Sequence, residues 1–95
     1  MFLVLLRFSA NKAQASRFME GHNAWIQRGF DDRVFLVVGS LQPNAGGAIL
    51  AHTMSRPALE ARVNQDPFVA EDVVKAEILE IAPGRADERL RFLVD

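Results

Sequence analysis

The sequence contains no cysteine, and this absence removes several kinds of site. Without thiols the chain can form no disulfide, no thiolate nucleophile and no zinc–thiolate centre. Its two histidines alone make a poor cage for a metal ion, so we expect neither a metal nor any other cofactor. The lack of cysteine also agrees with a cytoplasmic location, which is the location we expect.

An excess of charge of one sign is also missing. The formal net charge of -1 provides no general basic field, so we expect neither nucleic acid nor an anionic membrane as a partner. The chain lacks a long apolar run as well. The segment from Phe2 to Leu6 is too short for a signal-peptide core and far too short to span a membrane, so it indicates a strand.

What remains is the composition of an ordinary folded domain. The chain has 95 residues, of which 49% are hydrophobic and 24% are charged, and no linker or repeat interrupts it. A chain of this length buries too little surface for two cores, so we expect one domain over residues 1–95. We place its core in residues 2–82 and treat residues 83–95 as a C-terminal tail.

The N-terminal third predicts a strand followed by a long helix. Residues 2–8 form a β-rich run that is apolar at both parities, as in a strand that is covered on both faces. From Asn11 to Gly29 the period changes to that of a helix, with Asn11 as its N-cap and Gly29 as its stop. The apolar stripe of this helix is formed by Ala15, Phe18, His22, Trp25 and Ile26.

The middle of the chain predicts a hairpin and a second helix. Residues 34–38 form an apolar strand with both faces buried, and residues 48–54 form the strand that pairs with it. The turn formers of residues 39–47 make a loop that is longer than a tight turn needs, which suits the rim of a site. Ser55 caps the second helix, and Asp66 with Pro67 ends it.

The last predicted strand spans residues 73–82. Its charged residues Lys75, Glu77 and Glu80 are typical of a strand at the edge of a sheet. The tail after Pro83 is ambiguous, because its apolar residues fit either the alternation of a strand or the period of a helix.

The predicted order β-α-β-β-α-β favours an α+β, ferredoxin-like sandwich, with a four-stranded antiparallel sheet and both helices on one face. The first two strands are apolar at both parities, so the second sheet face would be a large hydrophobic patch. We expect a second copy to cover it, giving a homodimer. The alternative is that the C-terminal tail folds across that face.

His22 and Asp66 are the residues that could carry chemistry. His22 lies on the buried stripe of the first helix, and Asp66 lies where the second helix ends on the same face of the sheet. A carboxylate that binds one ring nitrogen fixes the tautomer and makes the other nitrogen a general base suited to neutral pH. The alternative is a satisfied core histidine beside a carboxylate that caps a turn, and spacing alone favours this second interpretation.

Other candidates are weaker. Ser40 could donate a hydrogen bond to a ligand, although small polar residues at strand ends are more often turn formers. Trp25 and Phe68 could line an aromatic pocket, although aromatic residues at core spacing usually fill the core. His52 has no acidic neighbour in the sequence, so we expect it to be structural.

Several of these features together resemble the YciI-like (YCII-related) proteins over residues 2–82. They are His22 followed by Trp25, Val38-Gly39-Ser40, Gly46-Gly47, the helix led by Ser55, and Asp66-Pro67-Phe68. The resemblance implies a ferredoxin-like fold assembled as a dimeric α/β barrel, and an active site formed by His22 and Asp66. A similar domain is associated with dehydrochlorination of a chlorinated hydroxyquinol. The sequence departs from the family at Ile81-Ala82-Pro83, where many relatives carry an aromatic residue.

Two functions follow from these expectations. The first is a small cofactor-independent lyase or isomerase that acts on a hydrophobic or cyclic metabolite, with His22 as acid/base and Asp66 orienting it. The second is a non-catalytic dimeric module that binds a small ligand or a protein. The turn formers of residues 39–47 favour a ligand site, while the lack of a second acid, a nucleophile or a metal set argues against demanding chemistry.

Overall fold

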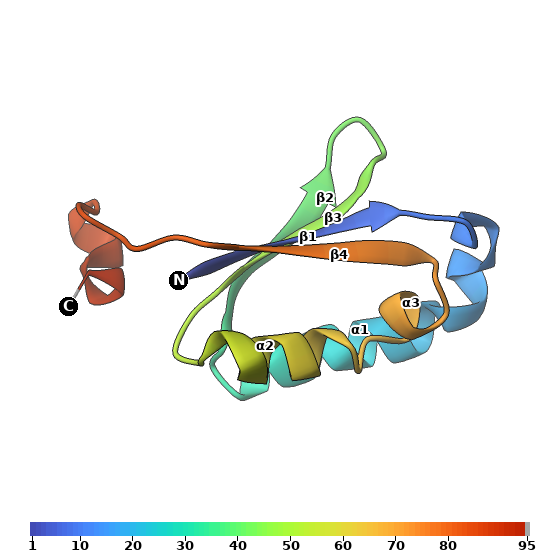
Figure 1. Cartoon of the computed structure of the whole chain (residues 1–95), viewed down its shortest axis with the longest axis horizontal. Coiled ribbons are helices and arrows are strands. Elements are labelled where there is room, and N and C mark those ends of the chain that lie inside the picture. The colour runs from blue at the N-terminus through green and yellow to red at the C-terminus, as the bar shows by residue number, and fades with distance from the viewer. Residues whose placement is uncertain (95) are drawn as a thin grey trace.

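A four-stranded antiparallel sheet with the strand order β2-β3-β1-β4 forms the centre of the molecule (Figure 1). The computed structural model describes residues 1–94. Within them the strands are β1 (Phe2–Phe8), β2 (Phe35–Leu41), β3 (Gly46–Ala51) and β4 (Val74–Glu80). The helices α1 (Ala15–Asp31), α2 (Arg56–Val63) and α3 (Pro67–Ala70) lie together on one face of the sheet. The predicted α+β, ferredoxin-like sandwich is confirmed, with β4 at a sheet edge.

The core lies between the sheet and the helices. Alternate residues of β1, beginning with Phe2 and Val4, point to the helices and are almost fully buried. They meet Trp25 of α1 and Leu59 of α2, which are 1% and 0% exposed. The apolar stripe read from the sequence of α1 therefore packs on the face of the sheet that holds the core.

Both predicted ends of the first helix are wrong. A 3-10 turn, η1 (Lys12–Gln14), precedes α1, and Asn11 donates its side-chain N–H to the carbonyl of Glu71 at 2.8 Å instead of capping the helix. At the other end α1 continues past Gly29 to Asp31. A Cβ at Gly29 would lie 2.0 Å from Cδ2 of Phe35, so this glycine serves close packing, not termination.

The hairpin between β2 and β3 is tighter than the sequence predicted. β2 runs to Leu41 and β3 begins at Gly46, so most of the glycine-rich segment belongs to the strands. Gly46 has φ of +124°, and a Cβ there would lie 1.9 Å from the carbonyl oxygen of Leu6. The third strand also ends at Ala51, earlier than predicted, and Thr53 beyond it has φ of 60°.

Helix α2 begins as predicted, because the side chain of Ser55 accepts a hydrogen bond from the N–H of Ala58 at 3.3 Å. It ends at Val63, and Asp66 does not simply mark its end. Asp66 caps the short helix α3, accepting from the N–H of Phe68, with Pro67 at the first helical position. This one-turn helix was missed in the sequence.

Among the residues that the structure describes, no helix covers the other face of the sheet. The strand register places Val37, Leu50, Leu3 and Leu79 in one row across all four strands on this face. Val37 is 59% exposed, so the prediction that both faces of the second strand are buried is wrong for the single chain. We call this row the apolar row.

The tail leaves the sheet after β4 and forms a 3-10 segment, η2 (Glu88–Leu93). Figure 1 shows it beyond the end of the sheet on the side of the N-terminus, so it does not fold across the apolar row. Its residue Phe92 is 50% exposed. The last residue of the predicted tail, Asp95, lies outside the described residues. Among residues 1–94, no helix is long and apolar enough to cross a membrane.

Candidate functional site

The structure brings His22 and Asp66 together. Nδ1 of His22 lies 2.8 Å from Oδ1 of Asp66, although 44 positions separate the two residues in the chain. The pair forms because His22 faces the core from α1 while Asp66 caps α3, which packs against α1. The side chain of His22 is 13% exposed, whereas that of Asp66 is fully buried. Solvent therefore reaches the pair only at the imidazole.

Asp66 uses a single oxygen for two hydrogen bonds. Its Oδ1 accepts from the N–H of Phe68 at 3.0 Å as well as lying against Nδ1 of His22. Its Oδ2 is buried and has no hydrogen-bond partner among residues 1–94. A buried carboxylate with one unpaired oxygen is electrostatically costly, and the two hydrogen bonds to Oδ1 offset part of that cost.

The imidazole is held from its face as well as from its edge. The ring of Phe68 stacks on it with the centroids 3.9 Å apart and the planes at 4°. The same helix turn therefore supplies the capping carboxylate of Asp66 and the stacking ring two residues later. With Nδ1 committed to Asp66, the nitrogen left for a ligand is Nε2.

A cavity of about 360 Å³ lies beside the pair. His22, Ser40 and Phe68 all line it, so three of the residues singled out in the sequence share one cavity. The other lining residues are mostly apolar or small: Leu6, Phe8, Met19, Asn23, Ile26, Val38, Gly39, Gly46, Gly47, Ala48, Ile49 and Val74. The cavity is thus an apolar space with a few polar groups at its wall, the usual character of a small-molecule site.

Small residues of the hairpin make room for the cavity. Gly47 pairs with Leu6 on one side and with Ser40 on the other, so all three positions face the helices. A larger side chain at Gly47 would enter the space that Leu6 and Ser40 border. The sequence prediction associated these glycines with a loop at the rim, whereas the structure places them in the strands that form the wall.

Asn23 is a polar lining residue that the sequence reasoning missed. It follows His22 directly, one helical step of about 100° around α1. Asn23 therefore lies outside the apolar stripe, and helical periodicity gives no reason to select it. Its position next to His22 is the one signal in the sequence that could have found it.

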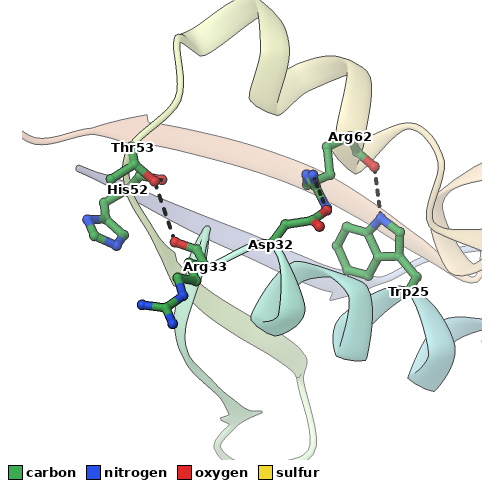
Figure 2. Close-up of polar contacts among 6 residues, drawn as sticks. All are labelled: Trp25, Asp32, Arg33, His52, Thr53 and Arg62. Atoms are coloured by element: carbon green, nitrogen blue, oxygen red, sulfur yellow. Dashed lines mark hydrogen bonds and ion pairs between the residues drawn. The ribbon is translucent and has the colours of Figure 1, made fainter.

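Trp25 lies outside this cavity wall. It is 1% exposed, and its indole N–H donates to the carbonyl of Arg62 at 2.9 Å. Figure 2 shows this contact next to the ion pair of Arg62 with Asp32, at 2.8 Å, so both bonds tie α2 to α1. The remaining histidine, His52, is also apart from the cavity, with its ring 5.4 Å from that of Phe92 in the tail.

A metal site is not formed by the side chains that the structure describes. Within residues 1–94, no group of three or more His, Cys, Asp or Glu side chains lies close enough together to hold an ion. The chemistry that this arrangement can perform with its own residues is proton transfer at His22, with Asp66 fixing the ring.

Comparison with known proteins supports the fold. No family model matches the chain, and no curated protein matches it. Among solved structures, 5-chloro-2-hydroxyhydroquinone dehydrochlorinase (TftG) from Burkholderia phenoliruptrix AC1100, in complex with 2,5-dihydroxybenzoquinone, is similar with a TM-score of 0.69. The match covers 88% of this chain and 96% of that chain at 14% sequence identity. A likeness at this identity shows the ferredoxin-like fold alone and leaves function to be argued from the site.

Proposed function

We propose that the chain is a small enzyme of the lyase or isomerase type, with His22 as general base and Asp66 as the residue that orients it. The observation that carries this proposal is that the cavity of about 360 Å³ is lined by an imidazole whose other edge is fixed by a fully buried carboxylate. A histidine that only fills a core has no need of an adjoining cavity. The proposed reaction requires only the residues of the chain.

The catalytic step is the removal of a proton from the ligand by Nε2 of His22. Asp66 accepts from Nδ1–H, which selects the neutral tautomer whose Nε2 can take a proton, and it stabilises the imidazolium that forms when the proton arrives. The electron pair left on the ligand forms a new double bond and expels a leaving group with its own electron pair. Return of the proton to another atom would instead give an isomerisation.

The cavity wall favours a small hydrophobic or cyclic ligand. Its apolar residues would bury a ring, and Ser40 and Asn23 could hydrogen-bond to oxygens on that ring. The similar structure bears on this point, because it is named a dehydrochlorinase and holds 2,5-dihydroxybenzoquinone, which is a small oxygenated ring. A hydroxylated, halogenated ring is therefore the first substrate class to test.

The test uses 2,5-dihydroxybenzoquinone as a binding probe and 5-chloro-2-hydroxyhydroquinone as a substrate, with chloride release as the measure of turnover. We expect His22→Gln to keep probe binding within a few-fold and to lose about 10²–10⁴-fold in turnover, the usual contribution of a general base. Asp66→Asn should lose part of that activity. Arg28→Gln, at an exposed position outside the cavity, is the control, and it should behave as the wild type does.

The outcomes separate the two functions. Turnover that survives His22→Gln would show that the assignment of the base is wrong. Probe binding without chloride release would point to the second function, a non-catalytic ligand-binding module that uses the same cavity. Absence of both would exclude this ring class as the ligand.

We further propose that the apolar row packs against that of a second copy, giving a homodimer through the sheet face. The proposal is supported by the row of Val37, Leu50, Leu3 and Leu79 and by the tail, which leaves this face open.

Leu3→Glu should convert a dimer to a monomer in light scattering. Because the chain has no cysteine, a single Leu3→Cys variant can report contact between copies by disulfide formation. A wild-type monomer at micromolar concentration would refute the dimer.

A further inference from the structure

A second hollow lies at the end of α1, apart from the cavity of His22. It has a volume of about 450 Å³ and is lined by Phe30, Arg33, Phe35, Leu36, His52 and Thr53. It shares no lining residue with the cavity of His22. The sequence predicts a structural role for His52 and none for Arg33, so neither the fold nor the proposed reaction accounts for this cluster.

Two left-handed residues meet at this hollow. Arg33 and Thr53 both have φ of 60°, and the hydroxyl of Thr53 lies 3.4 Å from the carbonyl oxygen of Arg33 (Figure 2). The N–H of His52 also donates to the carbonyl of Val34 at 3.0 Å, which fixes the two segments side by side. For a β-branched residue such as Thr53 this conformation is an outlier, and such residues cluster at ligand sites.

Arg33 occupies a position that normally belongs to glycine. The N–H of Val34 binds the carbonyl of Gly29, and the N–H of Arg33 binds that of Phe30, which is the pattern of a Schellman motif at the end of α1. The left-handed residue of this motif is most often glycine because it has no Cβ. This chain has the long cationic side chain of Arg33 at that position, which favours a binding role for its guanidinium.

The two basic side chains make no polar contact with the side chains that the structure describes. Among residues 1–94, neither the guanidinium of Arg33 nor the imidazole of His52 makes a hydrogen bond or an ion pair. Figure 2 shows both side chains projecting to the same side of the molecule. The ring of Phe30, 39% exposed, lines the hollow beside them.

We propose that this hollow is a second ligand site, which binds a small aromatic carboxylate. The carboxylate would take a paired hydrogen bond from the planar guanidinium of Arg33 and a further one from the ring of His52. The aromatic part would pack against Phe30 and Leu36. This site is independent of the reaction proposed at His22.

The test is an NMR titration of the full chain with benzoate, and with benzyl alcohol as a neutral probe of similar shape. Benzoate should give saturable shifts at Arg33, His52 and Thr53, and benzyl alcohol should bind at least about tenfold more weakly, because a charge-assisted contact is lost. Inorganic phosphate shows whether the anion alone is sufficient. If phosphate binds as well as benzoate does, the aromatic part of the proposal is wrong.

Arg33→Gly is the decisive variant, because glycine suits the left-handed position and the chain should stay folded. We expect it to raise the melting temperature by about 4 °C while weakening benzoate by at least about tenfold. Arg28→Gln removes an exposed arginine in the last turn of α1, five positions earlier, and should leave the affinity within about twofold. Unchanged affinity in Arg33→Gly, or equal loss in Arg28→Gln, would overturn the proposal.

Discussion

The two histidines of this chain differ in almost everything except their chemistry. His22 is fixed by Asp66 along its edge and by Phe68 on its face, and it borders a cavity. His52 has a single aromatic neighbour, Phe92, which is half exposed in the tail. Residue type alone therefore assigns no role to a histidine, because the partners of the ring decide which nitrogen is free and how far the ring can move.

The difference arises from the elements that carry the partners. The partners of His22 come from α3, a short helix that is held against α1, and the capping carboxylate is fully buried. The partner of His52 comes from η2, which lies beyond the end of the sheet (Figure 1). The surroundings of His22 are held by the hydrogen bonds of a buried carboxylate, whereas those of His52 depend on a segment with no buried residues.

Among the changes that alter the surroundings of the two histidines, removal of the carboxylate of Asp66 should have the largest effect. Asp66→Ala deletes the cap of α3 and the partner of His22, and we expect the free energy of unfolding to fall by about 2–4 kcal/mol. Asp66→Asn keeps an oxygen that can accept both hydrogen bonds, so it should cost clearly less. Urea unfolding measures both values. Equal losses for the two variants would mean that the charge, not the hydrogen bonds, holds this region.

The next prediction concerns the space in front of His22. Gly47→Val places its side chain between Leu6 and Ser40, and the nearest atom to a new Cβ is the carbonyl oxygen of Gly39 at an acceptable 3.4 Å. The fold should therefore persist while the affinity for 2,5-dihydroxybenzoquinone falls by at least about tenfold, or about 1.4 kcal/mol. Calorimetry measures the affinity, and circular dichroism measures the fold.

Gly84→Val is the control for the filled cavity. Gly84 does not line the cavity, and a Cβ there would have no atom within 4 Å. Its valine should leave the affinity within about twofold. If both glycine variants bind the probe as the wild type does, the ligand does not enter this cavity.

The partner of His52 should matter far less to stability. Phe92→Ala removes the ring that lies 5.4 Å from His52, but Phe92 is 50% exposed, so we expect a loss of less than about 0.5 kcal/mol. Thermal unfolding measures this loss, with Phe68→Ala as the comparison. Phe68 is 6% exposed, so removal of its ring should lower the free energy of unfolding by about 3–5 kcal/mol. A large loss at Phe92 would show that the tail is integral to the domain.

Much of the fold was predictable because it depends on periodicity. The apolar run of β1 and the apolar stripe of α1 indicated a sheet packed against helices, and two helices on one sheet face then brought His22 near Asp66. Local signals failed where glycine has a tertiary role. Gly29 was interpreted as a helix stop, but it permits contact with Phe35, and Gly46 was assigned to a loop, but it permits contact with β1.

The finer features of the sites could not be read from the sequence. The short helix α3 spans only four residues, too few for a period to be visible, so the double use of Asp66 was hidden. The unpaired Oδ2 of Asp66 and the left-handed backbone of Arg33 both depend on how distant segments pack. Such features appear only when backbone angles and hydrogen bonds can be assigned atom by atom.

The smallest expected effect is that of low pH on the tail, which carries Phe92, the aromatic neighbour of His52. The side chain of Arg89, and then its backbone N–H, lowers the pKa of Asp87 below the ordinary value of 3.8. A carboxylate with a lowered pKa contributes stability above its unfolded value and loses it as the pH falls through the folded value. The start of η2 should therefore loosen below about pH 4, and the amide shift of Arg89, which binds the carboxylate of Asp87, should report it. Asp87→Asn should abolish that pH dependence in the same NMR titration, and a tail that responds identically in both proteins would show that Asp87 does not hold it.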